Sequence, residues 1–174
     1  MTVLKKLLDA VEAVLKVVTL GFYVAVVVVV VFQVLNRFWL HLPIVWTSDL
    51  AIICFIWLGF LTAARAVRNH GHFRMALTLD LVGDGLVRRL LELLAIGVGL
   101  ALFGLLTVKG YDMAVRGLRE VSPGLQVPMI WAYLALPVSA ALALLFYAEK
   151  LLDELSGRAR EQRARQSIED EEAI

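Results

Sequence analysis

Cysteine, histidine and charge are all scarce in this sequence, and the charges that exist avoid long stretches of the chain. The 174 residues include one cysteine and three histidines, and 19% are charged, against about 25% in soluble globular domains. Hydrophobic residues make up 60%, and the mean hydropathy is +0.79. This composition excludes a water-soluble globular enzyme and a disordered chain. The single Cys54 excludes an intrachain disulfide, and a net charge of +1 gives no argument for nucleic-acid binding.

Four long runs contain no Asp, Glu, Lys or Arg. They hold 20 residues between Lys16 and Arg37, 15 between Asp49 and Arg65, 16 between Glu92 and Lys109, and 28 between Glu120 and Glu149. A helix needs about 20 mostly apolar residues to cross a bilayer, and an open strand could not satisfy its backbone there. The sequence therefore predicts an all-α integral membrane protein with four transmembrane helices, at about 14–35, 47–67, 89–109 and 128–147. They form a membrane domain over residues 1–150, and a polar, charged tail follows at 151–174.

The distribution of basic residues predicts the orientation. Thirteen of the 17 Lys and Arg residues lie in the N-terminal segment, between helices two and three, or in the tail, and four lie on the other side. Because basic residues favour the cytoplasmic side, we expect both termini in the cytoplasm. Trp39, Trp46 and Trp131 all fall at the predicted outer ends, as in an aromatic belt. Within residues 70–91, apolar residues alternate with polar or small ones, and we expect this segment to lie in the cytoplasmic interface.

Histidines and buried charges, which would indicate a redox or transport site, are missing from the predicted helices. His41, His70 and His72 all lie outside them, so bis-histidine haem ligation is not expected. His70 and His72 alone make a poor metal site. The helix centres carry no charge that would mark an ion path. We therefore predict no catalytic residue, no cofactor and no metal.

Asp49 and Arg65 bracket the second predicted helix and are the charges nearest to the membrane core. They are 16 positions apart, which is about 24 Å along a helix axis, so they cannot pair with each other. Each must snorkel to an interface or meet a partner elsewhere, and for Asp49 that partner would be Arg37 or another subunit. Small residues four apart, in Gly59-xxx-Ala63 and Ala135-xxx-Ser139-xxx-Ala143, predict close helix packing.

Three segments together resemble one family of membrane proteins. The first includes Gln33-Val34-Leu35-Asn36-Arg37-Phe38, Trp46-Thr47-Ser48-Asp49-Leu50 and Phe55-Ile56-Trp57-Leu58-Gly59. The second is His72-Phe73-Arg74-Met75. The third and most specific is Ser122-Pro123-Gly124-Leu125-Gln126-Val127-Pro128-Met129-Ile130-Trp131-Ala132-Tyr133, with Pro137-Val138 beyond it. Over about residues 20–150 the chain resembles the small, DctQ-like membrane subunit of tripartite ATP-independent periplasmic (TRAP) transporters.

The resemblance implies both a function and partners. Such systems use a soluble periplasmic binding protein, a large membrane subunit that carries the substrate and sodium sites, and a small subunit similar to a scaffold. They take up organic anions, such as C4-dicarboxylates or sialic acid, through the inner membrane of bacteria or archaea, driven by an ion gradient. The resemblance and the interfacial positions together give candidates for contact with the large subunit or with lipid: Arg37, Trp46, Asp49, Trp57, Gly59, Arg65, His72, Pro123, Pro128, Trp131, Tyr133 and Pro137.

The residues alone leave two other functions open. One is a membrane anchor for a redox enzyme, which a haem absorbance band in the purified chain would indicate. The other is a small channel or exporter formed by oligomerisation, which ion flux through the chain alone would indicate. Pro123 and Pro128 also predict a rigid outer turn, re-entrant or packed on the surface, and Pro137 predicts a kink in the fourth helix.

Overall fold

The computed structural model describes residues 2–69 and 86–155, and all the regular elements within them are helices. They are α1 (Thr2–Leu35), the short π-helix η1 (Asn36–Leu40), α2 (Trp46–Asn69), α4 (Leu86–Arg116), α5 (Ile130–Tyr133) and α6 (Ala135–Leu155). Four segments are long and apolar enough to cross a membrane: Lys5–Leu40, Trp46–Arg68, Leu93–Arg116 and Ile130–Leu152. The predicted all-α membrane fold with four spans is confirmed.

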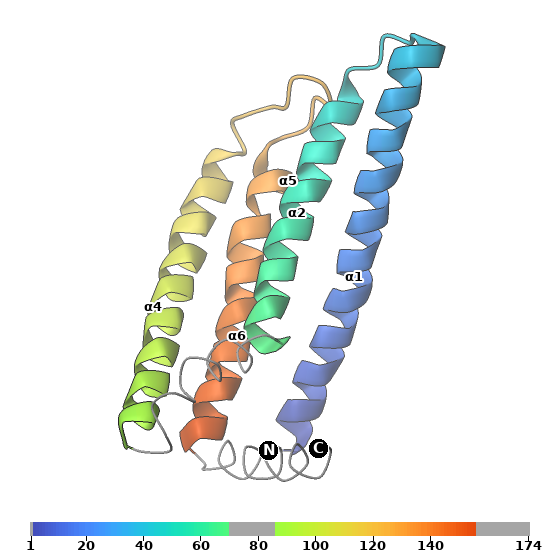
Figure 1. Cartoon of the computed structure of the whole chain (residues 1–174). Coiled ribbons are helices and arrows are strands. Elements are labelled where there is room, and N and C mark those ends of the chain that lie inside the picture. The colour runs from blue at the N-terminus through green and yellow to red at the C-terminus, as the bar shows by residue number, and fades with distance from the viewer. Residues whose placement is uncertain (1, 70–85, 156–174) are drawn as a thin grey trace, which may run out of the picture.

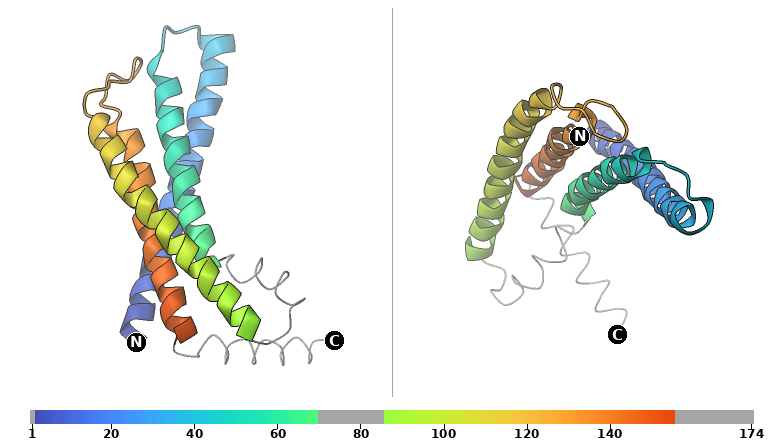
Figure 2. Two further views of the ribbon diagram at one scale, coloured as in Figure 1. Left: turned by 90° about the vertical axis from the view of Figure 1, so that its left-hand side faces the viewer. Right: turned by 90° about the horizontal axis from the view of Figure 1, so that it is seen from above.

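The long helices lie side by side in the order α1, α2, α6, α4 (Figure 2). α1 and α2 form one helical hairpin, α4 and α5–α6 form a second, and α2 packs on α6 where the two hairpins meet (Figure 1). One end of the bundle carries η1, residues 41–45 and residues 117–129, and we call it the loop end. The opposite end carries the start of α1 and the ends of α2 and α6, and we call it the terminal end.

Three helices extend beyond the predicted spans. α1 begins at Thr2 instead of near residue 14, α4 continues to Arg116 instead of 109, and α6 continues to Leu155 instead of 147. Hydropathy identifies only the part of a helix that lies in lipid. The backbone hydrogen bonds of a helix can extend into polar sequence beyond the membrane, so the helix is longer than its apolar run. In the predicted interfacial segment, residues 86–91 are already the first turns of α4. Residues 70–85 and the tail beyond 155 lie outside the described residues.

A break at Leu134 divides the fourth span into α5 and α6. Pro137 explains its position, because proline has no N–H and its ring would collide with the carbonyl four residues earlier, which is that of Tyr133. The sequence predicted a kink from Pro137, and the structure places the interruption one turn before it. The fourth span, predicted over 128–147 with an interruption by Pro137, corresponds to the candidate span Ile130–Leu152.

The packed core lies toward the terminal end, between α1, α2 and α6. Leu8, Leu15, Leu61 and Phe146 are buried together there. Further along α2, the ring of Trp57 stacks on Phe22 of α1, with 5.9 Å between the ring centroids.

Small residues let α6 approach its neighbours closely. Ala135, Ser139 and Ala143 are all buried, so the predicted small-residue stripe of α6 does face the packing. A Cβ at Gly99 of α4 would lie 2.5 Å from the ring of Tyr147, so any larger residue would require that ring to shift. Gly59, by contrast, is exposed and its absent Cβ would meet nothing within 4 Å.

Candidate functional site

Asn36 closes the connection between α1 and α2 at the loop end. Its side-chain amide donates to the carbonyl of Leu42 at 2.9 Å, and its side-chain oxygen accepts from the Leu42 N–H at 3.0 Å. The Asn36 carbonyl accepts from the N–H of His41, which adopts the left-handed conformation at φ 49°. Gln33, one turn earlier, donates to the hydroxyl of Ser48 at 2.9 Å. The family-like segment from Gln33 to Ser48 therefore forms one hydrogen-bonded turn between the two helices.

Asp49 links this turn to the loop of the second hairpin. Its Oδ2 accepts hydrogen bonds from the backbone N–H groups of Gly124, at 2.7 Å, and Leu125, at 3.0 Å. Ser122, which is 1% exposed, accepts from the N–H of Leu125 through its hydroxyl at 3.2 Å. Hydrogen bonds to an ionised carboxylate are roughly twice as strong as neutral ones. Asp49 thus fixes the 117–129 loop against the first turn of α2.

Gly124 lies so close to the start of α2 that any side chain there would force the loop to shift. A Cβ at this position would lie 2.5 Å from the carbonyl oxygen of Val45 and 3.0 Å from Oδ2 of Asp49. The loop is further fixed by a bridge between Val121 and Pro128. It is a folded turn packed on the bundle, as the prolines predicted.

Trp57 makes a second link between the hairpins, about two turns along α2 from Asp49. Its indole N–H donates to the carbonyl oxygen of Trp131 in α5, at 2.8 Å. That carbonyl lies in the turn just before the break at Leu134. The bond therefore joins α2 of the first hairpin to α5 of the second.

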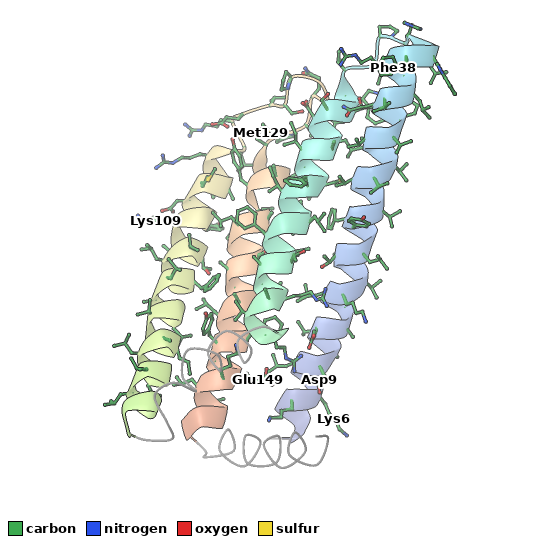
Figure 3. The ribbon with its side chains drawn as sticks, viewed as in Figure 1. Lys6, Asp9, Phe38, Lys109, Met129 and Glu149 are labelled. Atoms are coloured by element: carbon green, nitrogen blue, oxygen red, sulfur yellow. The ribbon has the colours of Figure 1, made fainter. Side chains whose placement is uncertain are left out.

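Arg68 makes a third link at the terminal end. Its guanidinium pairs with Asp9 and, at 2.7 Å, with Glu12 of α1, and at 3.3 Å with Glu149 of α6. It also donates to the carbonyl of Leu8 at 2.8 Å. Asp9 and Glu149 approach this position from α1 and α6 (Figure 3). One cation thus joins three helices, with only 14% of its side chain exposed.

The three links are spread along the whole membrane-spanning part of α2. Asp49 and Arg68 are 19 positions apart, about 28 Å along the helix axis, which is close to the thickness of a ~30 Å hydrocarbon core. Near Arg68, the ammonium group of Lys150 in α6 also donates to the carbonyl of Val67. The charged links therefore lie at the two ends of the span and the Trp57 link lies between them.

Of the residues predicted from the sequence, the structure brings three into these links, and three others have structural roles within the second hairpin. Asp49, Trp57 and Trp131 make the contacts described above, although the Trp131 side chain itself is 59% exposed. The hydroxyl of Tyr133 donates to Glu120 at 2.9 Å. Pro128 pairs with Val121, and the buried Pro137 causes the break. The partner of Asp49 lies in this chain and is not Arg37.

The other predicted residues make no such link within the described part of the chain. Trp46 and Pro123 are exposed at the loop end, as is Arg37, whose guanidinium lies 6.0 Å from the ring centroid of the adjacent Phe38. Arg65 has a buried Nε without a hydrogen-bond partner. His72 lies outside the described residues. No three His, Cys, Asp or Glu side chains within residues 2–69 and 86–155 are grouped to hold a metal.

Sequence reasoning missed the Arg68 cluster. Arg68 entered only as one of 13 basic residues on one side. A further indication was available, because Asp9, Glu12 and Glu149 adjoin predicted spans at the same end as Arg68. Acidic residues gathered beside a basic residue at one interface indicate ion pairs between helix ends.

These features define a small multi-pass membrane protein whose described helices are linked by polar contacts at both ends. The model of the DctQ component of tripartite ATP-independent periplasmic transporters matches residues 26–157. The chain belongs to this family, and it is therefore a component of a transporter and not an enzyme.

Two curated relatives are similar to the chain. One is the isethionate TRAP transporter permease protein DctMQ of Oleidesulfovibrio alaskensis, 31% identical over 147 residues, which are 78% of this chain and 22% of that protein. The other is the C4-dicarboxylate TRAP transporter small permease protein DctQ of Rhodobacter capsulatus, 31% identical over 101 residues, which are 57% of this chain and 44% of that protein. The matches thus span less than half the length of either relative.

Proposed function

We propose that the chain is the scaffold subunit of a TRAP-type secondary transporter. It would hold the fixed part of a large permease subunit in place while another part of that subunit moves the substrate. The observation that carries the proposal is the set of three links along α2, which join the two helical hairpins at Asp49, Trp57 and Arg68. A subunit that resists the motion of a partner needs helices that keep their relative positions, and links near both membrane surfaces oppose both sliding and splaying.

A large membrane partner is supported by the relatives. The match covers only 22% of the relative DctMQ. The letters M and Q in its name indicate a large and a small subunit joined in one chain. A small permease protein, as the second relative is named, also implies a larger one. The exposed apolar residues of α1 and α4 offer surface for such a partner and for lipid, among them Val17, Leu20, Val28, Leu94 and Leu105.

The transported substrate is proposed to be an organic anion, with a carboxylate as the first candidate. The names of the relatives mention isethionate and C4-dicarboxylates, both small organic anions. The family description, tripartite and ATP-independent, supports uptake driven by an ion gradient such as sodium, with a periplasmic binding protein that delivers the substrate. On the positive-inside argument, the loop end would face the periplasm and the terminal end the cytoplasm of a bacterial or archaeal inner membrane.

Uptake by the reconstituted complex tests the proposal. The variants Asp49→Asn, Trp57→Phe and Arg68→Gln would be purified with the large subunit and assayed in liposomes, with Arg119→Gln as an exposed control at the loop end. We expect less assembled complex and a lower maximal rate for the first three, with unchanged apparent affinities for substrate and coupling ion. A changed substrate preference or ion Hill coefficient in any of them would contradict a scaffold role.

A further inference from the structure

The face of α4 that points away from α6 changes from apolar to charged toward the loop end. α4 lies at the edge of the bundle and packs mainly on α6 (Figure 2). Residues three or four positions apart follow one another along its free face, and all are exposed: Val98, Leu102, Leu105, Lys109, Asp112 and Arg116. We call these six residues the α4 stripe. Lys109 lies on the side of α4 away from the other helices (Figure 3).

The three charges of the α4 stripe have no partner within residues 2–69 and 86–155. With Met113 they line a hollow of about 250 Å³. Pockets for drug-sized ligands have volumes of about 300–1,000 Å³, so this hollow suits a smaller group. A basic residue alone could snorkel to water, but a carboxylate that faces lipid is costly unless it is paired. Lys109 and Arg116 lie three and four positions from Asp112 on the same face of α4, so a ligand that carries both an anion and a cation would complement the three charges together.

The spacing of the charges fits a zwitterionic headgroup. Lys109 and Arg116 are seven positions apart, about 10 Å along the helix, so both long side chains can reach one phosphate between them. Arginine and lysine are the usual phosphate ligands in proteins. Asp112 lies between the two cations in sequence and suits a primary ammonium group. Phosphoethanolamine carries both groups, next to each other.

The apolar half of the α4 stripe fits the rest of such a lipid. Val98, Leu102 and Leu105 are 59%, 51% and 59% exposed and lie toward the middle of the span. A phospholipid of the leaflet at the loop end has the same order, with its headgroup outward and its acyl chains toward the bilayer centre. We propose that the α4 stripe binds one phosphatidylethanolamine molecule, through its phosphate at Lys109 and Arg116 and its ammonium at Asp112. This inference requires only that the chain spans the membrane and does not depend on the scaffold proposal.

Lipid retention measured by native mass spectrometry tests this inference. The full chain, in complex with its large subunit, would be taken from nanodiscs made of equal parts phosphatidylethanolamine, phosphatidylcholine and phosphatidylglycerol. We expect the ethanolamine lipid to be retained about two- to fivefold over the choline lipid, because the quaternary ammonium of choline has no N–H to donate to Asp112. Asp112→Asn should remove that preference and leave the total phospholipid unchanged. Lys109→Gln and Arg116→Gln should each lower retention of all three lipids about fivefold.

Arg119→Gln is the matched control, because it removes an exposed cation at the same end and off the stripe; it should change nothing. Equal retention of the ethanolamine and choline lipids by the unmodified complex would overturn the inference. So would a preference that persists in Asp112→Asn, or a preference for phosphatidylglycerol. Loss of the large subunit from the Lys109→Gln or Arg116→Gln complex, without a change in lipid, would show that the stripe is a protein interface instead.

Discussion

Removing the cation of Arg68 is the perturbation with the largest expected effect on stability. Arg68→Gln leaves Asp9 and Glu12 of α1 and Glu149 of α6 without the group that neutralises them. The change also removes the guanidinium that lies 5.5 Å from the ring centroid of Phe146. The carboxylates of α1 and α6 then repel each other, and α2 loses its link to both helices. The terminal end of the bundle should therefore loosen first.

The size of the expected stability loss depends on how exposed the side chain of each ion-pair partner is. An exposed ion pair contributes at most about 1 kcal/mol, whereas removing one partner of a buried pair costs about 3–5 kcal/mol. The side chains of Arg68 and Glu149 are 14% and 13% exposed, but that of Asp9 is 66% exposed. The cluster lies between the two limits, and we expect a loss of about 3 kcal/mol. At about 2–4 °C per kcal/mol for a chain of this size, the melting temperature should fall by about 6–12 °C.

Thermal unfolding followed by tryptophan fluorescence, in detergent, measures this fall. Lys16→Gln is the matched control, since Lys16 is an exposed basic residue on α1; it should shift the transition by less than about 2 °C. Adding Glu149→Gln to Arg68→Gln should restore part of the stability, because one uncompensated carboxylate disappears. An Arg68→Gln transition within about 2 °C of the unmodified chain would refute the role given to the cluster.

Three further predictions concern the other links. Asp49→Asn should weaken the loop contact by about 1.5–3 kcal/mol, and faster protease cleavage within residues 117–129 would report it; an unchanged cleavage rate would contradict it. Gly124→Ala should displace the loop from the carbonyl of Val45, so the same cleavage should accelerate even though the polar groups remain; equal rates would mean that the loop accommodates the methyl group. Trp57→Phe keeps a ring that can stack but loses the hydrogen bond to Trp131, so the melting temperature should fall by about 2–4 °C; a value equal to that of the unmodified chain would show that the bond contributes nothing.

The number and type of helices could be predicted from the sequence because lipid imposes one simple rule on every span. Each uncharged run corresponds to a helix long enough to cross the membrane, and the polar stretches between the runs correspond to helix ends or to connections between helices. The extent of α1 and α4 could not be predicted in this way, since helices continue beyond the lipid into polar sequence. The break at Leu134 could have been predicted from the sequence, because Pro137 disrupts the helical turn that precedes it.

The links between the hairpins were harder to predict for physical reasons. Asp49 accepts hydrogen bonds from two backbone N–H groups. Every residue except proline has such a group, so the sequence does not indicate which one will be the partner. Trp57 binds a carbonyl, for which the same holds. Arg68 pairs with residues 56 to 81 positions away, so helix periodicity could not bring them together. Only the arrangement of the four helices shows which charged ends meet.

A scaffold subunit should keep its two hairpins in the same relative positions while the transporter works. Spin labels at Val17→Cys on α1 and Leu94→Cys on α4, which are 70% and 65% exposed in the native chain, would report the distance between the outermost helices in a Cys54→Ser background. Pulsed electron paramagnetic resonance on the reconstituted complex should give the same distance distribution without ligand, with the coupling ion, and with ion and substrate. A distribution that shifts or splits when substrate is added would show that this subunit moves during transport, which contradicts its proposed role as a scaffold.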